Sequence, residues 1–171
     1  WLGVALFIFI LLFFVTAPYG RFSQNNWGPM ISSTAGWIIQ EAVSPIVFGY
    51  FFIIGTSIKT PVMWIFFIIW IGHYFNRSFI YPFRQHNSNN RMPITIMLSA
   101  VFFNIMNGFT NGYYLGSIVS TEYNNYLFEP NFILGLIVFM IGLIINLKSD
   151  HILITLKKEN KGYQIPNGFF Y

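Results

Sequence analysis

The sequence has no cysteine and very few charges. Without cysteine, neither a disulfide framework nor a thiolate metal site can form. Charged residues make up 8 % of the 171 residues, whereas soluble domains carry about 25 %. Hydrophobic residues make up 55 % and aromatic residues 21 %. This balance excludes an ordinary soluble domain and predicts a membrane protein.

Several classes of binding site are also not expected. His73, His86 and His151 show neither HxxxH nor HExxH spacing, so we expect no metal site. The formal net charge is only +4, and the aromatic residues lie in apolar runs rather than among basic ones, so we expect no nucleic-acid partner. Neither a GxGxxG nor a GxxxxGK[ST] motif occurs, which excludes a Rossmann or P-loop phosphate site.

Five apolar segments are long enough to cross a bilayer, which requires about 20 helical residues. They cover residues 1–16, 31–57, 61–81, 93–119 and 131–156. The first is short, and we expect the sequence to be truncated at both ends. No internal repeat and no domain-sized loop interrupts the series. The sequence therefore predicts an all-α integral membrane protein with one transmembrane domain over residues 1–171.

The charged residues of the loops predict the orientation. One side of the predicted membrane carries most of the basic residues, and the other carries Lys59, Glu122 and Glu129. The positive-inside rule places the basic side in the cytoplasm and the N-terminus outside. The residues on the basic side are Arg21, Arg84, Arg91, Lys148, Lys157, Lys158 and Lys161.

A carboxylate lies in the middle of the second apolar segment, where Gln40 precedes Glu41. A charge at that depth costs about 2.5–3.5 kcal/mol on insertion scales, so a partner is expected. Tyr74, in the third segment, lies within about one helical turn of the same depth. A tyrosine hydroxyl and a carboxyl at matched depth can hydrogen-bond and can polarise a substrate carbonyl. The alternative is a polar clamp between helices, and Gln40 is expected to support Glu41 rather than react.

Other polar residues recur at helical spacing near this pair. Arg77 follows Tyr74 at i+3 on the same helix face, where it suits an anionic ligand, an ion pair or snorkelling toward the headgroups. In the fourth segment, Gly108 and Gly112 are four residues apart, which indicates close helix packing. Three asparagines beside them are expected to hydrogen-bond across that packing, namely Asn104, Asn107 and Asn111.

A second polar cluster ends the fifth segment. Asn146 and Asp150 are spaced i, i+4, and Lys157 follows on nearly the same face. With Arg84 and Arg91 in a loop on the same side of the membrane, this cluster suits a phosphorylated cofactor. The alternative is an ordinary solvated helix end.

Taken together, five ordered segments resemble the steroid 5α-reductase family of integral-membrane NADPH enzymes. They are APYGR at 17–21, GWIIQE at 36–41, HYFNRSFIYP at 73–82, NGFTNGYYLG at 107–116, and INLKSDHIL with the later YQIPNG at 163–168. The resemblance implies seven transmembrane helices, of which this sequence holds five and lacks the last two. It also implies reduction of a carbon–carbon double bond conjugated to a carbonyl.

The resemblance assigns roles to the residues already singled out. It implies that Glu41 and Tyr74 hold the carbonyl oxygen, with Gln40 beside them, and that Trp37 and Phe103 contact the substrate. The substrate would be a lipid that arrives from the bilayer, in the first place a 3-oxo-4-ene steroid.

The resemblance also implies NADPH as the cofactor, bound on the cytoplasmic side. Asn146, Asp150 and Lys157 match the family's residues for the adenosine and phosphate portion. Arg84 and Arg91 are also assigned to the cofactor. The loop HNSNNRMP, in which Arg91 lies, departs from the family pattern. Ser99 stands where many steroid-reducing members carry an arginine.

Several alternatives remain open at this point. Within the same superfamily, the protein could be a trans-2-enoyl-CoA reductase or a polyprenol reductase. From another class, the polar pairs could belong to a non-catalytic transport or structural membrane protein. The sequence leaves open whether the membrane is a bacterial inner membrane or the endoplasmic reticulum, and what the oligomeric state is.

Overall fold

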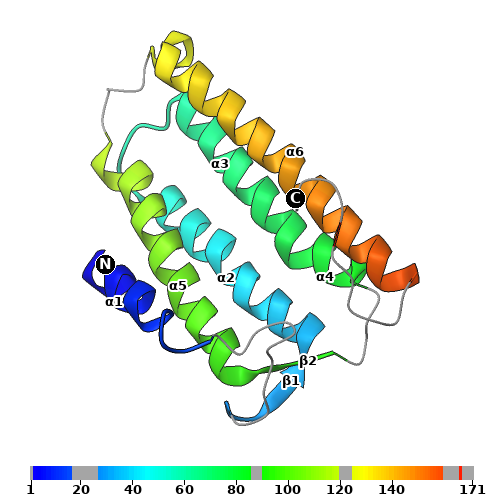
Figure 1. The fold of residues 1–171 in the computed structure, drawn as a ribbon. Coiled ribbons are helices and arrows are strands. Elements are labelled where there is room, and N and C mark those ends of the chain that lie inside the picture. The colour runs from blue at the N-terminus through cyan, green and yellow to red at the C-terminus, as the bar shows by residue number, and fades with distance from the viewer. Residues whose placement is uncertain (1, 17–26, 86–89, 120–124, 160–165, 167–171) are drawn as a thin grey trace.

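The structure, a computed structural model, describes residues 2–16, 27–85, 90–119, 125–159 and 166. Its helices run nearly parallel or antiparallel to one another, and a small strand pair lies at one end of the bundle (Figure 1). The α-helices are α1 (Leu2–Leu11), α2 (Ser33–Ile54), α3 (Pro61–Phe75), α4 (Tyr81–Arg84), α5 (Ile94–Tyr113) and α6 (Pro130–Glu159). The remaining elements are the π-helices η2 (Asn76–Ile80) and η3 (Tyr114–Ile118), the 3₁₀-helix η4 (Tyr126–Phe128), and the strands β1 (Met30–Ser32) and β2 (Arg91–Pro93).

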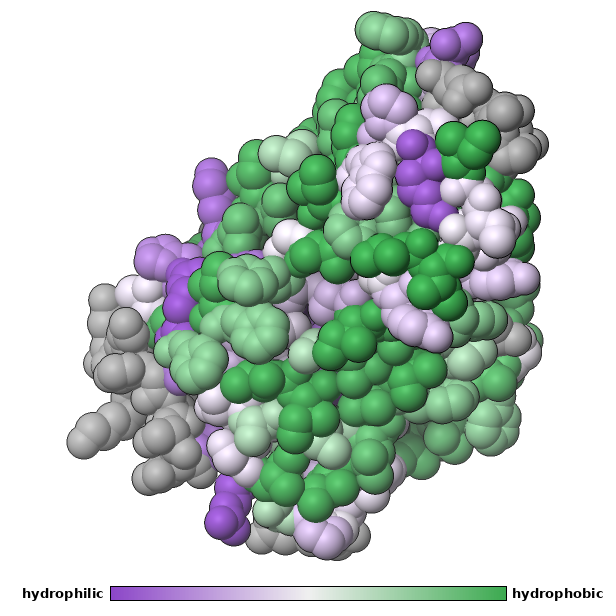
Figure 2. All heavy atoms as spheres, turned by 180° about the vertical axis from the view of Figure 1, so that it is seen from behind, coloured by the Kyte–Doolittle hydropathy of each residue, from purple (hydrophilic) through white to green (hydrophobic). Residues whose placement is uncertain are grey.

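The helices have the composition of a membrane protein, as predicted. Three are long and apolar enough to cross a bilayer: Ser33–Ile54, Ile94–Ile118, and Pro130–Leu156. Large apolar side chains are exposed along them, and Figure 2 shows a broad hydrophobic face on the molecule. An exposed apolar surface of this extent is suited to lipid rather than to water. The number of five spans stays a prediction.

A short antiparallel strand pair, which the sequence analysis missed, sets where two helices begin. Met30 pairs with Pro93, and Ser32 pairs with Arg91. The backbone is extended at Met92 because the residue before a proline is biased away from the helical region. The pair holds the starts of α2 and α5 at the same level, since Ile94 N donates to Pro29 O over 2.9 Å.

The closest helix packing lies between α2 and α5, and glycines on α5 make it possible. A Cβ atom at Gly108 would lie 2.8 Å from the carbonyl oxygen of Ser44, and one at Gly112 would lie 2.6 Å from that of Phe48. The predicted close packing at these two glycines is therefore confirmed. On its other side α2 packs against α3, where Phe48 stacks on Trp70 with ring centroids 4.7 Å apart.

Gly112→Ala is expected to lower stability by about 1–3 kcal/mol, because the new methyl group would press on backbone rather than on a flexible side chain. The matched control is Gly142→Ala on α6, where a Cβ would meet nothing within 4 Å. That change should be neutral or slightly stabilising, since alanine favours a helix over glycine by about 1 kcal/mol. Thermal unfolding in detergent tests both variants, and equal melting temperatures would contradict the packing.

The helix that begins as α3 widens into η2 before it reaches Pro82. Proline has no N–H and its ring crowds the carbonyl four residues earlier, here that of Ser78. The chain responds with a π-type bond in which Tyr81 N donates to Asn76 O. Such widened turns recur at functional sites. Here the widened turn contains Arg77, whose contacts are described below.

Candidate functional site

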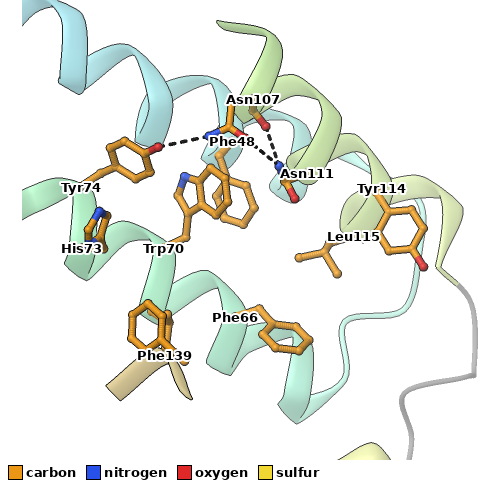
Figure 3. Close-up of a pocket in the computed structure, with 11 residues that line it drawn as sticks. Phe48, Phe66, Trp70, His73, Tyr74, Asn107, Asn111, Tyr114, Leu115 and Phe139 are labelled. Carbon is orange, nitrogen blue, oxygen red and sulfur yellow. Dashed lines mark hydrogen bonds between the residues drawn. The ribbon is translucent and has the colours of Figure 1, made fainter. Parts of the chain in front are cut away.

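A cavity of about 600 Å³ lies between α2, α3, α5 and α6. Most of its wall is apolar, and polar groups from α3 and α5 meet at one end (Figure 3). This volume is within the range of about 300–1,000 Å³ typical of small-molecule sites. The lining residues are Phe48, Phe66, Ile69, Trp70, His73, Tyr74, Asn107, Asn111, Tyr114, Leu115 and Phe139.

Tyr74 brings its hydroxyl to the polar end of this cavity. Asn107 of α5 donates a hydrogen bond from Nδ2 to the hydroxyl oxygen over 3.2 Å (Figure 3). Asn111 in turn donates from Nδ2 to both oxygens of Asn107, over 2.9 Å to the backbone oxygen and 3.1 Å to Oδ1. The tyrosine side chain is therefore held by a chain of amides that begins on α5.

Glu41 lies beside Arg77 rather than in hydrogen-bond contact with Tyr74. Its Oε1 is 3.6 Å from an Arg77 guanidinium nitrogen and accepts a 3.4 Å hydrogen bond from Gln40 Nε2. Asn104 donates from Nδ2 to the backbone oxygen of Gln40 over 2.8 Å, which ties α5 to α2 at this point. A direct Glu41–Tyr74 hydrogen bond, allowed by depth alone, is absent here, because the two side chains have different partners on the described helices.

Arg77 joins two carboxylates and stacks on aromatic rings. Besides Glu41, it approaches Oδ2 of Asp150 on α6, at 3.9 Å. Its guanidinium lies 4.7 Å from the Trp37 ring and 4.9 Å from the Tyr81 ring. All three charged side chains are largely buried, so each charge depends on the others for compensation. Of the three roles that the sequence left open for Arg77, the structure supports the ion pair.

The second half of α6 presents acceptor atoms that receive no hydrogen bond from the described part of the chain. Oδ1 of Asn146 and Oδ2 of Asp150 are buried and accept no hydrogen bond from any described residue. Buried acceptors of this kind fit a ligand that brings hydroxyl or amino donors, such as a ribose or an adenine. Arg84 is near, with a nitrogen 3.4 Å from His151 Nδ1. These residues are chemically suited to the adenosine portion of a dinucleotide.

The other predicted site residues are more dispersed. Trp37 is buried against Arg77, next to Glu41 but outside the cavity wall. Phe103 is 50 % exposed and does not line the cavity. Arg91 is exposed in β2, and the side chain of Lys157 lies outside the described residues. The roles assigned to these four residues stay predictions.

Sequence reasoning missed two nitrogen groups that line the cavity beside Tyr74. Trp70 and His73 precede it at i−4 and i−1 on α3, and their buried Nε1 and Nδ1 atoms have no hydrogen-bond partner among the described residues. The i−4 spacing of Trp70 was a signal that could have placed it on the face of Tyr74. With Asn107 and Asn111, they make this end of the cavity able to contact a polar atom of a ligand.

The sequence of this chain is similar to those of known proteins. The family model described as 3-oxo-5-alpha-steroid 4-dehydrogenase matches residues 90–171. The chain is 34 % identical over 168 residues to the steroid 5-alpha-reductase DET2 of Arabidopsis thaliana, covering 95 % of this chain and 64 % of the relative. It is 32 % identical over 171 residues to the DET2 of Gossypium hirsutum, covering 96 % of this chain and 66 % of the relative. It is 31 % identical over 166 residues to the 3-oxo-5-alpha-steroid 4-dehydrogenase 1 of Bos taurus, covering 94 % and 63 %. The chain thus spans slightly less than two thirds of the length of these relatives.

Proposed function

This chain belongs to the steroid 5α-reductase family, and we propose that its protein reduces a carbon–carbon double bond conjugated to a carbonyl in a membrane lipid. The proposed substrate class is the 3-oxo-4-ene steroids, and the proposed reductant is NADPH. The relatives named steroid 5-alpha-reductase and 3-oxo-5-alpha-steroid 4-dehydrogenase support this choice. The protein is an integral membrane protein, so an apolar substrate can enter from the bilayer.

The observation that carries the proposal is the position of Tyr74. Its hydroxyl is one of the polar groups that gather at one end of an apolar cavity large enough for a steroid-sized ligand. A ligand with one carbonyl and an otherwise apolar body has the matching polarity. The carbonyl would lie at Tyr74, and the apolar body would extend toward Phe66 and Leu115.

The chain's own residues would act on the carbonyl oxygen. Bound NADPH would supply a hydride to the β-carbon of the enone. As that carbon is attacked, the π electrons of the double bond move toward the carbonyl, and negative charge develops on the oxygen. Tyr74 would donate a hydrogen bond to that oxygen and stabilise the enolate. Protonation of the α-carbon then completes the reduction.

Glu41 is proposed to complete the oxygen clamp, with Gln40 in support. Its carboxyl contacts Gln40 and Arg77 and does not line the cavity. Trp37 and Phe103 are proposed substrate contacts, although neither lines the cavity as it stands. Rotation of the Glu41 side chain away from Arg77 would be required for a direct contact with the substrate oxygen.

Five residues are proposed to hold the cofactor from the cytoplasmic side. The oxygens of Asn146 and Asp150 that receive no hydrogen bond from the described residues support a contact with hydroxyl or amino groups. Arg84, Arg91 and Lys157 would supply positive charge for phosphate. A cofactor site on the cytoplasmic side is consistent with the proposed topology, which has five spans in this sequence and an N-terminus outside. Either a bacterial inner membrane or the endoplasmic reticulum fits it.

The direct test measures NADPH oxidation by the full-length protein with candidate substrates. A 4-ene-3-ketosteroid should be reduced, and its saturated counterpart, which lacks the conjugated bond, should not. Turnover of a trans-2-enoyl-CoA alone, or of a polyprenol alone, would replace the steroid assignment. Turnover of none of them would leave the transport or structural alternative in place.

A further inference from the structure

We propose that Asn107 is a positioning residue whose amide fixes the Tyr74 hydroxyl as a hydrogen-bond donor into the cavity. The inference deepens the proposed function and rests on it. A tyrosine hydroxyl both donates and accepts, so its position alone does not determine what it offers to a ligand. The two asparagines behind it remove that ambiguity.

The direction of the hydrogen bonds is set by a backbone carbonyl. The backbone oxygen of Asn107 can only accept, and the Asn111 side-chain atom 2.9 Å from it must therefore be the donor Nδ2. That same nitrogen lies 3.1 Å from the end of the Asn107 side chain, so the atom of Asn107 facing it must be the acceptor Oδ1. Reversal of either amide would set two donors or two acceptors against each other.

The remaining amide group of Asn107 then has to face Tyr74. Its Nδ2 lies 3.2 Å from the tyrosine oxygen, and an amide NH₂ group can only donate (Figure 3). The tyrosine oxygen accepts this bond, so its own O–H must point elsewhere. Within the described residues the hydroxyl donates to no acceptor, and Tyr74 lines the cavity, so we infer that the O–H points into the cavity.

A donor already turned toward the substrate oxygen is what a developing enolate requires. Preorganised donors act on the transition state because they need no reorientation when charge develops. Asn107 thus acts through Tyr74, and Asn111 acts through Asn107. The arrangement selects ligands with an acceptor at this end, such as a carbonyl, over ligands that have no acceptor there.

The sharpest test is Asn107→Asp, which has nearly the same shape but can reverse the polarity. When ionised, the introduced carboxylate can still accept from Asn111, yet it would also accept from Tyr74 and turn the O–H away from the cavity. When protonated, it can again donate to the tyrosine oxygen. We expect kcat to fall about 10²-fold as pH rises through the titration of the new carboxyl, as for the loss of one preorganised donor. KM should change much less, and the wild type should lack this pH limb.

Two further variants keep the test independent of folding effects. Asn107→Leu removes the amide without reversing it, and we expect roughly a tenfold fall in kcat with no new pH limb, less than for a lost donor. Thr110→Val is the control, because the Thr110 hydroxyl is exposed and bonds only within α5, to Met106 O. It should leave kcat and its pH dependence unchanged. A pH-independent kcat equal to that of the wild type in N107D, or an equal loss in N107D and Asn107→Leu at every pH, would overturn the inference.

A binding measurement separates failure of the inference from failure of the proposed function. If the wild type reduces no enone, the proposed function fails whatever Asn107 does. Binding of a 3-ketosteroid and of its 3-deoxy counterpart can still be compared by quenching of tryptophan fluorescence. The wild type should prefer the ketone, and N107D should lose that preference at high pH. An unchanged preference would count against the donor assignment.

Discussion

Replacing Tyr74 by phenylalanine is expected to lower kcat for enone reduction about 10²–10³-fold, the usual effect of deleting one donor to a developing oxyanion. The hydroxyl is the polar group nearest to the proposed carbonyl position, and Asn107 already holds it from behind. The phenyl ring keeps the ring contact with Trp70, whose centroid lies 5.4 Å away, so the fold should persist. Steady-state kinetics of the full-length variant measure the effect.

Cofactor affinity separates this loss of chemistry from general damage. The Kd for NADPH should stay near the wild-type value in Tyr74→Phe, because the proposed cofactor residues Asn146 and Asp150 are on α6. Tyr50→Phe provides the matched control, since Tyr50 is 59 % exposed on α2 and does not line the cavity. Unchanged turnover in Tyr74→Phe would exclude the oxygen clamp.

Arg77→Met is expected to destabilise the protein by about 3–5 kcal/mol, the usual cost of breaking a buried ion pair. The variant leaves the carboxylates of Glu41 and Asp150, which are 13 % and 10 % exposed, without their shared cation. It also removes the guanidinium that stacks on Trp37 and Tyr81. Thermal unfolding in detergent should show a clearly lowered melting temperature.

Charge and shape contribute separately to the role of Arg77. Arg77→Lys keeps the charge but loses the planar group that stacks on the rings, so it should recover only part of the stability. Adding Glu41→Gln and Asp150→Asn to Arg77→Met removes the uncompensated charges and should recover more of it. A triple variant that is no more stable than Arg77→Met would show that lost packing, rather than charge, dominates.

Spacing along each helix could be predicted from the sequence, but direction around each helix could not. Counting residues placed Glu41 and Tyr74 at a similar level, and spacing of Gly108 and Gly112 predicted the close contact with α2, which the structure confirms. Whether two side chains at one level also face each other depends on how the helices are rotated and packed. Because of that rotation, Glu41 forms an ion pair with Arg77, and Tyr74 accepts a hydrogen bond from Asn107.

The remaining differences come from contacts distant in sequence. The spacing of residues around Arg77 does not predict its ion pair with Asp150, because α6 is brought to η2 only by tertiary packing. The widened turn before Pro82 changes the direction of the residues in it, which an ideal helical count does not include. The β1–β2 pair was missed because three-residue strands lie at the edges of long apolar runs.

Isotope labelling follows the transferred hydrogen itself and tests directly whether NADPH reduces the conjugated double bond. The full-length protein is incubated with NADPH that carries deuterium at the transferable position of the nicotinamide and with a 4-ene-3-ketosteroid. We expect a saturated ketone with deuterium at the former β-carbon, and the same label at a much lower rate with Tyr74→Phe. A product without deuterium at that carbon, or labelling by Tyr74→Phe at the wild-type rate, would contradict it.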